Sequence, residues 1–252
     1  MTDETSEMPN ETRPALRVAH APRVAAPKRG RVGLVFNGVW SHYAFATAPK
    51  YRDVYELVYV HDLAYDRVRD FDALVIPFQS NHAAIAERRD AVYRLLADGK
   101  TVAVFGDTSP AWIDAQWEWR PTNNWWWVDD PTRPPIAHTD FTHPLFKGLT
   151  QRHACWHTHG AYTRLAPEGR VLQLSDRDEA ITWETHEYGG TLLASTLDPV
   201  VEHGVQQIRH LDHFCDNMTE WLCGVRPAGR LEVDPAAYGR PWADPRGPQV
   251  TA

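Results

Sequence analysis

The sequence predicts a doubly wound α/β domain built on a mostly parallel β-sheet. Apolar, β-prone segments alternate with helical patterns through the first half of the chain, and polar residues follow several of these segments directly. The apolar segments are nearly continuous, which is typical of parallel strands covered on both faces by helices. With 252 residues, of which 43% are hydrophobic, the chain can bury a substantial core within one domain.

Four strands separated by helices are expected before residue 106. The expected strands are residues 31–36 (RVGLVF), 56–60 (ELVYV), 71–77 (FDALVIP) and 101–105 (TVAVF). A short helix is expected near residues 43–50, and an amphipathic helix over residues 82–98. Right-handed crossovers would then place the carboxyl ends of the strands at one edge of the sheet.

The fourth strand is followed by a sharp turn at Gly106, within the segment TVAVFGDTSPAW (residues 101–112). Pro110 suits the first turn of a helix, and Ser109 or Thr108 can cap that helix. Such a turn directs side chains and free N–H groups to the edge where open α/β sheets bind ligands. The pattern favours the geometry of a nucleophile elbow, and an ordinary strand–helix junction with a capping hydroxyl is the alternative.

A tryptophan-rich insertion is expected after the fourth strand, over about residues 112–152. Seven of the eleven tryptophans lie between Trp112 and Trp156, among Pro, Asn and Asp. An indole can stack on a sugar or anchor an interface. The alternative is that these rings pack a loop-rich subdomain onto the sheet, because three consecutive tryptophans at 125–127 cannot all face one ligand.

The second half returns to strands, expected at residues 154–162, 169–174, 180–184 and 190–197, before a closing helix at about 203–222. Alternation within the first of these strands places His157 and His159 on one face, a spacing that suits metal ligation or paired hydrogen bonds. The chain has 13 histidines and no HExxH motif. We therefore assign no metal and no cofactor, and His157 and His159 remain only candidate metal ligands.

Composition and the two ends of the chain restrict the classes of partner. Residues 1–29 and 225–252 lack apolar periodicity and are expected to be extended or disordered tails around a domain of residues 30–224. A net charge of −7 argues against nucleic acid, and no apolar run is long enough to span a membrane or form a secretion signal. Three cysteines without CxxC spacing indicate reduced thiols. These observations predict a cytoplasmic protein that binds neither nucleic acid nor membranes.

From about residue 31 to 224, the order of segments resembles the class I glutamine amidotransferase-like superfamily. The segments that carry the resemblance are FDALVIPFQSN (71–81), DGKTVAVFGDTSPAW (98–112), NNWWW (123–127), WHTHGAY (156–162) and GGTLLASTLDPVVEHG (189–204). The likeness is strongest to the divergent branch that holds ThuA-like proteins and the middle domain of some β-galactosidases. The resemblance implies a flavodoxin-like fold.

Two positions depart from the catalytic pattern of this superfamily. Active members carry a cysteine nucleophile in a Gly-x-Cys-x-Gly turn, where this chain has Thr108, and a His-Pro-Glu group, where this chain has Asp198-Pro199-Val200. A threonine hydroxyl needs an adjacent base, and an aspartate cannot shuttle protons as an imidazole does near neutral pH. The resemblance therefore implies a pseudoenzyme scaffold without amidotransferase activity.

Polar residues at or just beyond the predicted strand ends form the candidate site. They are Asn37, His42, Gln79, Ser80, Asn81, Asp107, Thr108, Ser109, Asp198, Glu202 and His203. We expect them to bind a small polar or sugar-like ligand at the carboxyl edge of the sheet.

Three alternatives to a ligand-binding site remain. A hydrolase would use Ser109 or Thr108 as nucleophile, His203 or His42 as base, and the N–H groups after Gly106 as an oxyanion hole. A non-catalytic assembly domain, in a homo-oligomer, would use the tryptophan-rich region and the tails for contacts between its copies. In the simplest alternative, Asp107 and Asp198 only cap helices, and His203 only begins the last helix.

Overall fold

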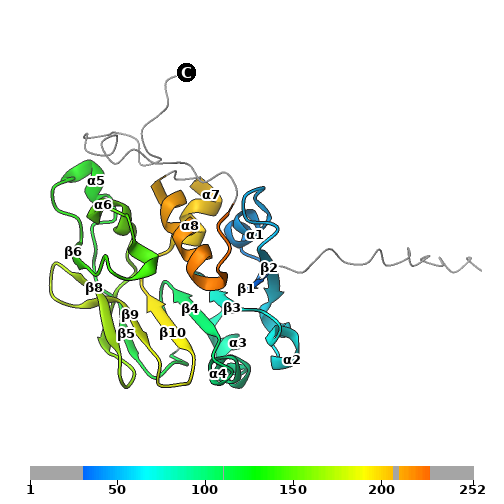
Figure 1. The fold of residues 1–252 in the computed structure, drawn as a ribbon. Coiled ribbons are helices and arrows are strands. Elements are labelled where there is room, and N and C mark those ends of the chain that lie inside the picture. The colour runs from blue at the N-terminus through cyan, green and yellow to red at the C-terminus, as the bar shows by residue number, and fades with distance from the viewer. Residues whose placement is uncertain (1–30, 110, 207–209, 228–252) are drawn as a thin grey trace, which may run out of the picture.

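The computed structural model describes residues 31–109, 111–206 and 210–227 of the chain (Figure 1). The tails expected at residues 1–29 and 225–252 lie outside the described residues, apart from residues 225–227.

The described strands form one mixed sheet that is parallel at one end. Five strands in the order β2-β1-β3-β4-β10 are parallel: β1 (Val32–Phe36), β2 (Tyr55–Tyr59), β3 (Ala73–Ile76), β4 (Thr101–Phe105) and β10 (Thr191–Ser195). The rest of the sheet continues antiparallel from β10 through β9 (Ala180–Thr185), β7 (Ala161–Arg164) and β5 (Gln116–Glu118), with β8 (Arg170–Ser175) on β9 and β6 (Ile136–Thr139) on β8. The expected parallel sheet is thus confirmed for one end of the sheet only.

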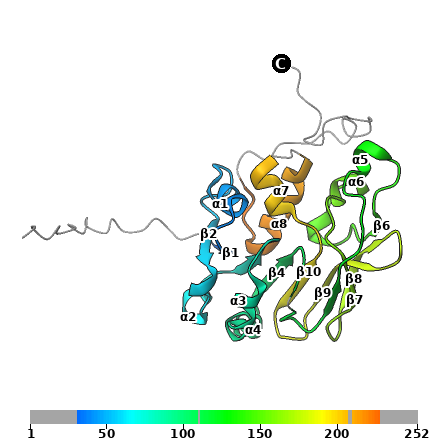
Figure 2. The same cartoon turned by 180° about the vertical axis from the view of Figure 1, so that it is seen from behind.

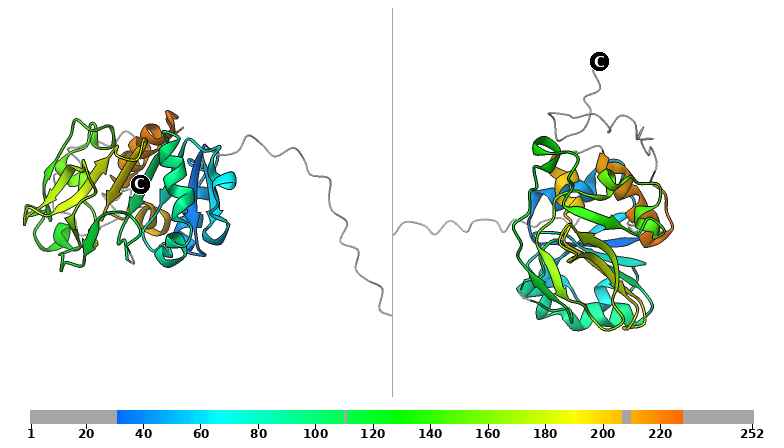
Figure 3. Two further views of the ribbon diagram at one scale, coloured as in Figure 1. Left: turned by 90° about the horizontal axis from the view of Figure 1, so that it is seen from below. Right: turned by 90° about the vertical axis from the view of Figure 1, so that its left-hand side faces the viewer.

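Helices cover both faces of the parallel end. In Figure 1, α1 (Trp40–Thr47), α7 (Pro199–Gln206) and α8 (His210–Cys223) lie above the strands, and α2 (Tyr65–Val68), α3 (His82–Ala86) and α4 (Arg89–Ala97) lie below them. Figures 2 and 3 show the same arrangement from behind, from below and from the side. The buried residues form two hydrophobic clusters, and neighbouring residues of one strand belong to different clusters. Leu34 packs in the cluster that contains Phe45 and Phe214, whereas Val35 packs in the cluster that contains Val92. This division follows from the alternation of side chains along a strand.

The tryptophan-rich segment extends the sheet. Its strands β5 and β6 pair with β7 and β8, and the short elements α5 (Trp126–Asp129), η2 (Pro144–Phe146) and α6 (Gln151–Ala154) connect them. Trp112, Trp126 and Trp156 are buried, which agrees with packing onto the sheet, whereas Trp119 is exposed.

Several expected elements differ in the structure. The amphipathic helix expected over residues 82–98 is two helices, α3 and α4, which are separated at residues 87–88. The expected strand at residues 154–162 begins as the end of α6, whose capping box joins Thr150 and His153, and β7 begins only at Ala161. Gly160 interrupts the segment with a φ of +89°, and a Cβ atom there would lie 2.3 Å from the carbonyl oxygen of Glu118. In place of the expected closing helix the structure has two described helices: α7, which starts earlier than expected at Pro199, and α8, which starts at His210.

The described part of the chain contains no helix with the length and apolar character that crossing a membrane requires.

Helix α1 is tied to the strand-end turn after β3 by a buried histidine. The Nε2 atom of His42 donates a hydrogen bond to the carbonyl oxygen of Phe78 at 2.7 Å, and the His42 side chain is fully buried. Burial lowers the pKa of His42 to about 4, although the hydrogen bond to Phe78 acts in the opposite direction. His42 is therefore neutral in the folded protein at neutral pH.

Gly204→Ala is expected to destabilise the fold by about 1–3 kcal/mol. A Cβ atom at this position would lie 2.2 Å from the backbone oxygen of Ser41, where α7 meets α1. Chemical denaturation measures the loss, and Gly99→Ala is the comparison. Gly99 has a φ of +78° and open space around a would-be Cβ, so its substitution reports backbone strain alone. A Gly204→Ala protein as stable as the wild type would contradict the close approach of the two helices.

The neutral His42 predicts a loss of stability at mildly acidic pH. Because its folded pKa of about 4 lies below the ordinary value of 6.5, its contribution is complete above pH 6.5 and is lost as the pH falls toward 4. The loss amounts to about 3 kcal/mol at most. His42→Gln keeps an N–H donor without a titrating ring. Its free energy of unfolding, measured by urea denaturation from pH 7 to pH 4, should therefore vary less; equal pH dependence in both proteins would contradict the prediction.

Candidate functional site

The predicted site residues follow the ends of parallel strands at one edge of the sheet. Asn37 follows β1, Gln79 follows β3, Asp107 follows β4 and Asp198 follows β10. Because these strands are parallel neighbours, their carboxyl ends share that edge. The structure thus brings the predicted residues to a common edge, although their side chains have different partners.

The turn after β3 is held by side-chain amides. Gln79 adopts a φ of +67°, and Asn37 donates a hydrogen bond from Nδ2 to the Gln79 carbonyl oxygen at 3.1 Å. Asn81 caps α3, because its Oδ1 atom accepts a hydrogen bond from the backbone N–H of Ala84. The Gln79 side chain itself is exposed at the edge. Asn37 and Asn81 therefore support the turn, whereas Gln79 is presented to solvent.

The turn after β4 is as tight as the sequence predicts, but the helix expected to follow it, capped by Thr108 or Ser109, is absent from the described residues 106–109 and 111–115, which lead to β5. Gly106 has a φ of +87°, and a Cβ atom at this position would lie 2.4 Å from the Phe78 ring. Thr108 is 2% exposed, and its hydroxyl lies 2.9 Å from the hydroxyl of Tyr162. Ser109 is exposed. The turn requires glycine, but the hydroxyl at the nucleophile position is engaged inside the protein.

The two histidines proposed as bases have other partners. His203 hydrogen-bonds through Nε2 to Asp212 on α8, and its ring packs edge-on against Phe45 and Tyr51 at 5.5 Å. His42 is bonded to the turn after β3. Among the described residues, no hydrogen bond joins Thr108 or Ser109 to either histidine.

Two of the predicted ligand-binding residues, Asp198 and Glu202, come together where β10 ends with the two candidate metal ligands, His157 and His159, and we call these four residues the edge cluster. His157 Nδ1 lies 3.1 Å from Glu202 Oε1 and 3.8 Å from Asp198 Oδ2. His159 donates a hydrogen bond from Nε2 to Asp198 Oδ2 at 2.9 Å. The two histidines lie outside any strand, yet both reach the same carboxylate.

Local structure explains how the edge cluster forms. Asp198 immediately precedes α7 and Glu202 lies four residues later, so the two carboxylates share one side of the helix start. The backbone N–H of Glu202 donates to the carbonyl oxygen of Asp198 at 3.2 Å. The segment with the two histidines is held beside the end of β10 by an antiparallel bridge between Thr158 and Leu197.

Burial makes the edge cluster electrostatically unusual. Only 1% of the Asp198 side chain is exposed, and burial raises the pKa of this carboxyl even though the bond from His159 lowers it. Burial would lower the pKa of His157, but Glu202 and Asp198 together raise it above its ordinary value. Asp198 Oδ1 and Glu202 Oε2 are buried and have no hydrogen-bond partner among the residues that the structure describes. Two carboxylates thus share a site with few compensating donors.

Aromatic side chains fix the position of His159. The ring of Phe78 stacks on His159 with centroids 3.8 Å apart, and Trp117 donates from Nε1 to the His159 carbonyl oxygen at 2.6 Å. Neither Phe78 nor Trp117 was predicted as a site residue, because no local pattern reveals a contact between segments so far apart in sequence.

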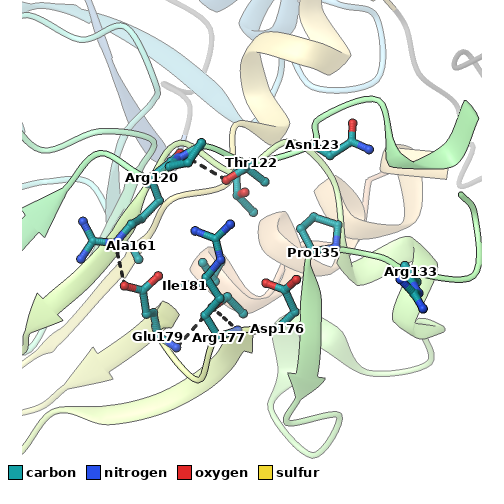
Figure 4. Close-up of a pocket in the computed structure, with 14 residues that line it drawn as sticks. Arg120, Thr122, Asn123, Arg133, Pro135, Ala161, Asp176, Arg177, Glu179 and Ile181 are labelled. Carbon is teal, nitrogen blue, oxygen red and sulfur yellow. Dashed lines mark hydrogen bonds and ion pairs between the residues drawn. The ribbon is translucent and has the colours of Figure 1, made fainter. Parts of the chain in front are cut away.

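A small cavity of about 160 Å³ lies on the tryptophan-rich side of the sheet (Figure 4). Figure 4 shows Arg120 and Glu179 on one side of it and Asn123 on the other, and Arg120 pairs with Glu179 at 2.6 Å. Thr158 lines this cavity, and its two neighbours in sequence are the histidines of the edge cluster. The cavity and the edge cluster thus adjoin the same short segment. The lining residues were not predicted, since they come from separate loops.

Some aromatic residues are exposed near this edge. Trp40 is 67% exposed, begins α1 and stacks on Tyr43 with ring centroids 5.4 Å apart. Trp119, after β5, is 69% exposed. The prediction of a functional aromatic surface rested on residues 112–156, and Trp40 lies outside that range.

Comparison with protein-family models and with curated protein sequences finds no match. Solved structures do match. A protein from Bacteroides uniformis described as ThuA-like has a TM-score of 0.50 and 15% identity, over 83% of this chain and 98% of that one. A protein from Thermoplasma acidophilum described as belonging to GMP synthase has a TM-score of 0.49 and 14% identity, over 76% and 96%.

An exo-β-1,4-mannosidase from an Opitutaceae bacterium has a TM-score of 0.42 and 11% identity, over 74% of this chain and 35% of that chain. At such low identity, the similarity concerns the fold alone. The match to the ThuA-like structure agrees with the resemblance found in the sequence. The chain therefore has the class I glutamine amidotransferase-like fold.

Proposed function

We propose that this chain is a divergent glutamine amidotransferase-like domain, without the cysteine–histidine catalytic pair, that binds a small polar or sugar-like ligand at the carboxyl edge of its sheet. The order β2-β1-β3-β4-β10 supports a flavodoxin-like arrangement of the parallel strands. The observation that carries the proposal is the gathering of polar side chains at the shared strand ends, with the edge cluster where β10 ends.

The contacts of Thr108 support the loss of amidotransferase chemistry. Its hydroxyl is buried against Tyr162, whose own pKa is raised by burial. A nucleophilic hydroxyl needs a base within hydrogen-bond reach, and His203 is instead bonded to Asp212. The hydrolase alternative is therefore weaker than the binding function.

The rim of the edge suits a ligand with several hydroxyl groups. Gln79 and Ser109 are exposed, and Asp107 is half-buried, so amide, hydroxyl and carboxylate groups are available there. Trp40 offers an exposed indole of the kind that stacks on the apolar face of a sugar ring. The small cavity beside Thr158 also favours a small ligand over a drug-sized one, for which pockets of about 300–1,000 Å³ are typical.

Saturating concentrations of a matching ligand are expected to raise the melting temperature. At a hundredfold excess over the dissociation constant, the gain is about 2.7 kcal/mol, or about 5–10 °C for a domain of this size. A thermal-shift screen of sugars, polyols, amino acids and nucleotides, in the presence of a chelator, checks this. Asp107→Ala should reduce the ligand-induced rise in melting temperature. Asp66 is an exposed acidic residue on α2, and Asp66→Ala should leave that rise unchanged. A screen without any shift would contradict the binding function.

Thr108→Val is expected to destabilise the protein by about 1 kcal/mol through loss of the hydrogen bond to Tyr162, while leaving the ligand-induced shift intact. Tyr162→Phe removes the same hydrogen bond from the other side and should cost a similar amount. Denaturation and the thermal-shift assay measure both effects. If turnover of an ester or glycoside were lost in Thr108→Val and kept in Tyr162→Phe, Thr108 would be a nucleophile and the hydrolase alternative would replace the proposal.

The exposed indoles favour assembly as a second candidate function. Trp40 and Trp119 each expose about two thirds of their surface, and large exposed aromatic side chains are common anchors of interfaces. A homo-oligomer held by these residues would show a multiple of the 28.7 kDa chain mass in light scattering. Trp119→Ser or Trp40→Ser should then shift the population toward monomer, and a wild type that is monomeric at high concentration would exclude this candidate.

A further inference from the structure

We propose that His157, Asp198 and Glu202 bind one divalent transition-metal cation, with His159 as a positioning residue for Asp198. This inference goes beyond the proposed function, because the edge cluster can hold a cation whether or not an organic ligand binds at the rim. Three donor atoms, one from each residue, lie within 4.8 Å of one another.

The spacing of the donor atoms matches a coordination shell. Bonds of about 2.0–2.2 Å from a cation to nitrogen and oxygen ligands place neighbouring ligands about 3.4 Å apart in a tetrahedron. His157 Nδ1 lies 3.1 Å from Glu202 Oε1 and 3.8 Å from Asp198 Oδ2, on either side of this value. The two spacings from His157 therefore bracket the tetrahedral value, and each of the three residues offers a donor atom within 4.8 Å of the other two.

The charge of the edge cluster also calls for a cation. Asp198 and Glu202 have side-chain exposures of 1% and 9%, and each has one buried oxygen that finds no hydrogen-bond partner in the described part of the chain. Burying such groups without partners is costly. A protonated His157 would supply one positive charge against two carboxylates. A divalent cation with a neutral His157 would balance both charges. If either carboxylate bound it in a bidentate way, the unpartnered oxygen of that carboxylate (Asp198 Oδ1 or Glu202 Oε2) would also reach the cation.

His159 has the place of an outer hydrogen-bond donor. Its Nε2–H group bonds Asp198 Oδ2 at 2.9 Å, and stacking on Phe78 holds the ring in place. A carboxylate oxygen has more than one lone pair, so this bond leaves Asp198 able to coordinate. Donors of this kind orient metal ligands and raise the affinity of metal sites.

The donor set selects the chemical class of cation. One imidazole nitrogen with two carboxylate oxygens suits Zn²⁺ or Mn²⁺ better than Ca²⁺ or Mg²⁺, which favour oxygen-only shells. Three protein ligands also leave at least one coordination position open. A hydroxyl or carboxylate group of a small polar ligand could occupy that position.

Metal binding by the full chain tests the proposal directly. Protein treated with a chelator and then dialysed is titrated with Zn²⁺ and, separately, with Mn²⁺, by calorimetry, and bound metal is counted by plasma mass spectrometry. We expect one equivalent to bind and to raise the melting temperature. Failure of the wild-type protein to bind either cation with a dissociation constant below about 10 μM would overturn the proposal, whatever the variants do.

Variants then locate the bound cation. Glu202→Gln and Asp198→Asn should each weaken binding by about 100-fold or more, and His159→Gln by about 10–100-fold. Glu184→Gln is the matched control, because Glu184 also forms a buried pair with a histidine, His143 at 3.2 Å, and should leave binding unchanged. Circular dichroism confirms folding. Tight binding that survives the Asp198→Asn, Glu202→Gln double substitution would place the cation elsewhere and refute the proposal.

The two proposals fail in different ways. One equivalent of bound metal without any shift in the organic panel would leave the cation site standing and remove the proposed function. An organic ligand that shifts the melting temperature in chelator, together with no metal binding, would do the reverse.

Discussion

The position of β10 is the constraint on which the rest of the described structure depends. It pairs parallel with β4 on one side and antiparallel with β9 on the other, so it joins the two halves of the sheet. The last residue of β10 is Ser195, whose carbonyl oxygen accepts a hydrogen bond from the backbone N–H of Gly106. The Ser195 hydroxyl lies 2.7 Å from the Thr182 hydroxyl. The N–H of Leu197 also donates to the Ser195 hydroxyl. These buried hydrogen bonds fix the direction in which the chain leaves β10, and thereby place Asp198 and α7 beside the edge.

The turn after β4 combines a tight backbone geometry with a threonine hydroxyl that is engaged inside the protein. Gly106 retains a left-handed backbone and a close approach to Phe78. The residue that would act as nucleophile, Thr108, instead hydrogen-bonds Tyr162 on β7. The geometry of the turn is set by backbone sterics, whereas nucleophilic catalysis requires an activating base. At this edge of the sheet, the polar side chains that contact one another are concentrated in the edge cluster at the end of β10, and not at the turn after β4.

Burial governs the electrostatics of that edge. Burial lowers the pKa of His42, so this histidine is neutral where it bonds the Phe78 carbonyl oxygen. In the edge cluster, two buried carboxylates lie beside His157 with fewer donors than they can accept. A buried histidine with one neutral partner is a stable structural contact, and an excess of buried negative charge calls for a compensating cation. The two histidines thus differ in their partners, because His42 bonds one carbonyl oxygen whereas His157 lies beside two carboxylates.

The sequence by itself determined the parts that depend on local pattern. The positions of β1, β3, β4 and β10, the turn at Gly106 and the polar residues at the strand ends follow from apolar runs and from glycine's conformational freedom. Those local signals place each element but carry no information about which distant segments meet. Only the tertiary structure therefore decided that β5 and β6 extend the sheet, that His203 pairs with Asp212, and that His157 and His159 reach Asp198 about forty residues away. Such contacts arise from the packing of the whole domain, because the energy that selects them is shared among many buried residues.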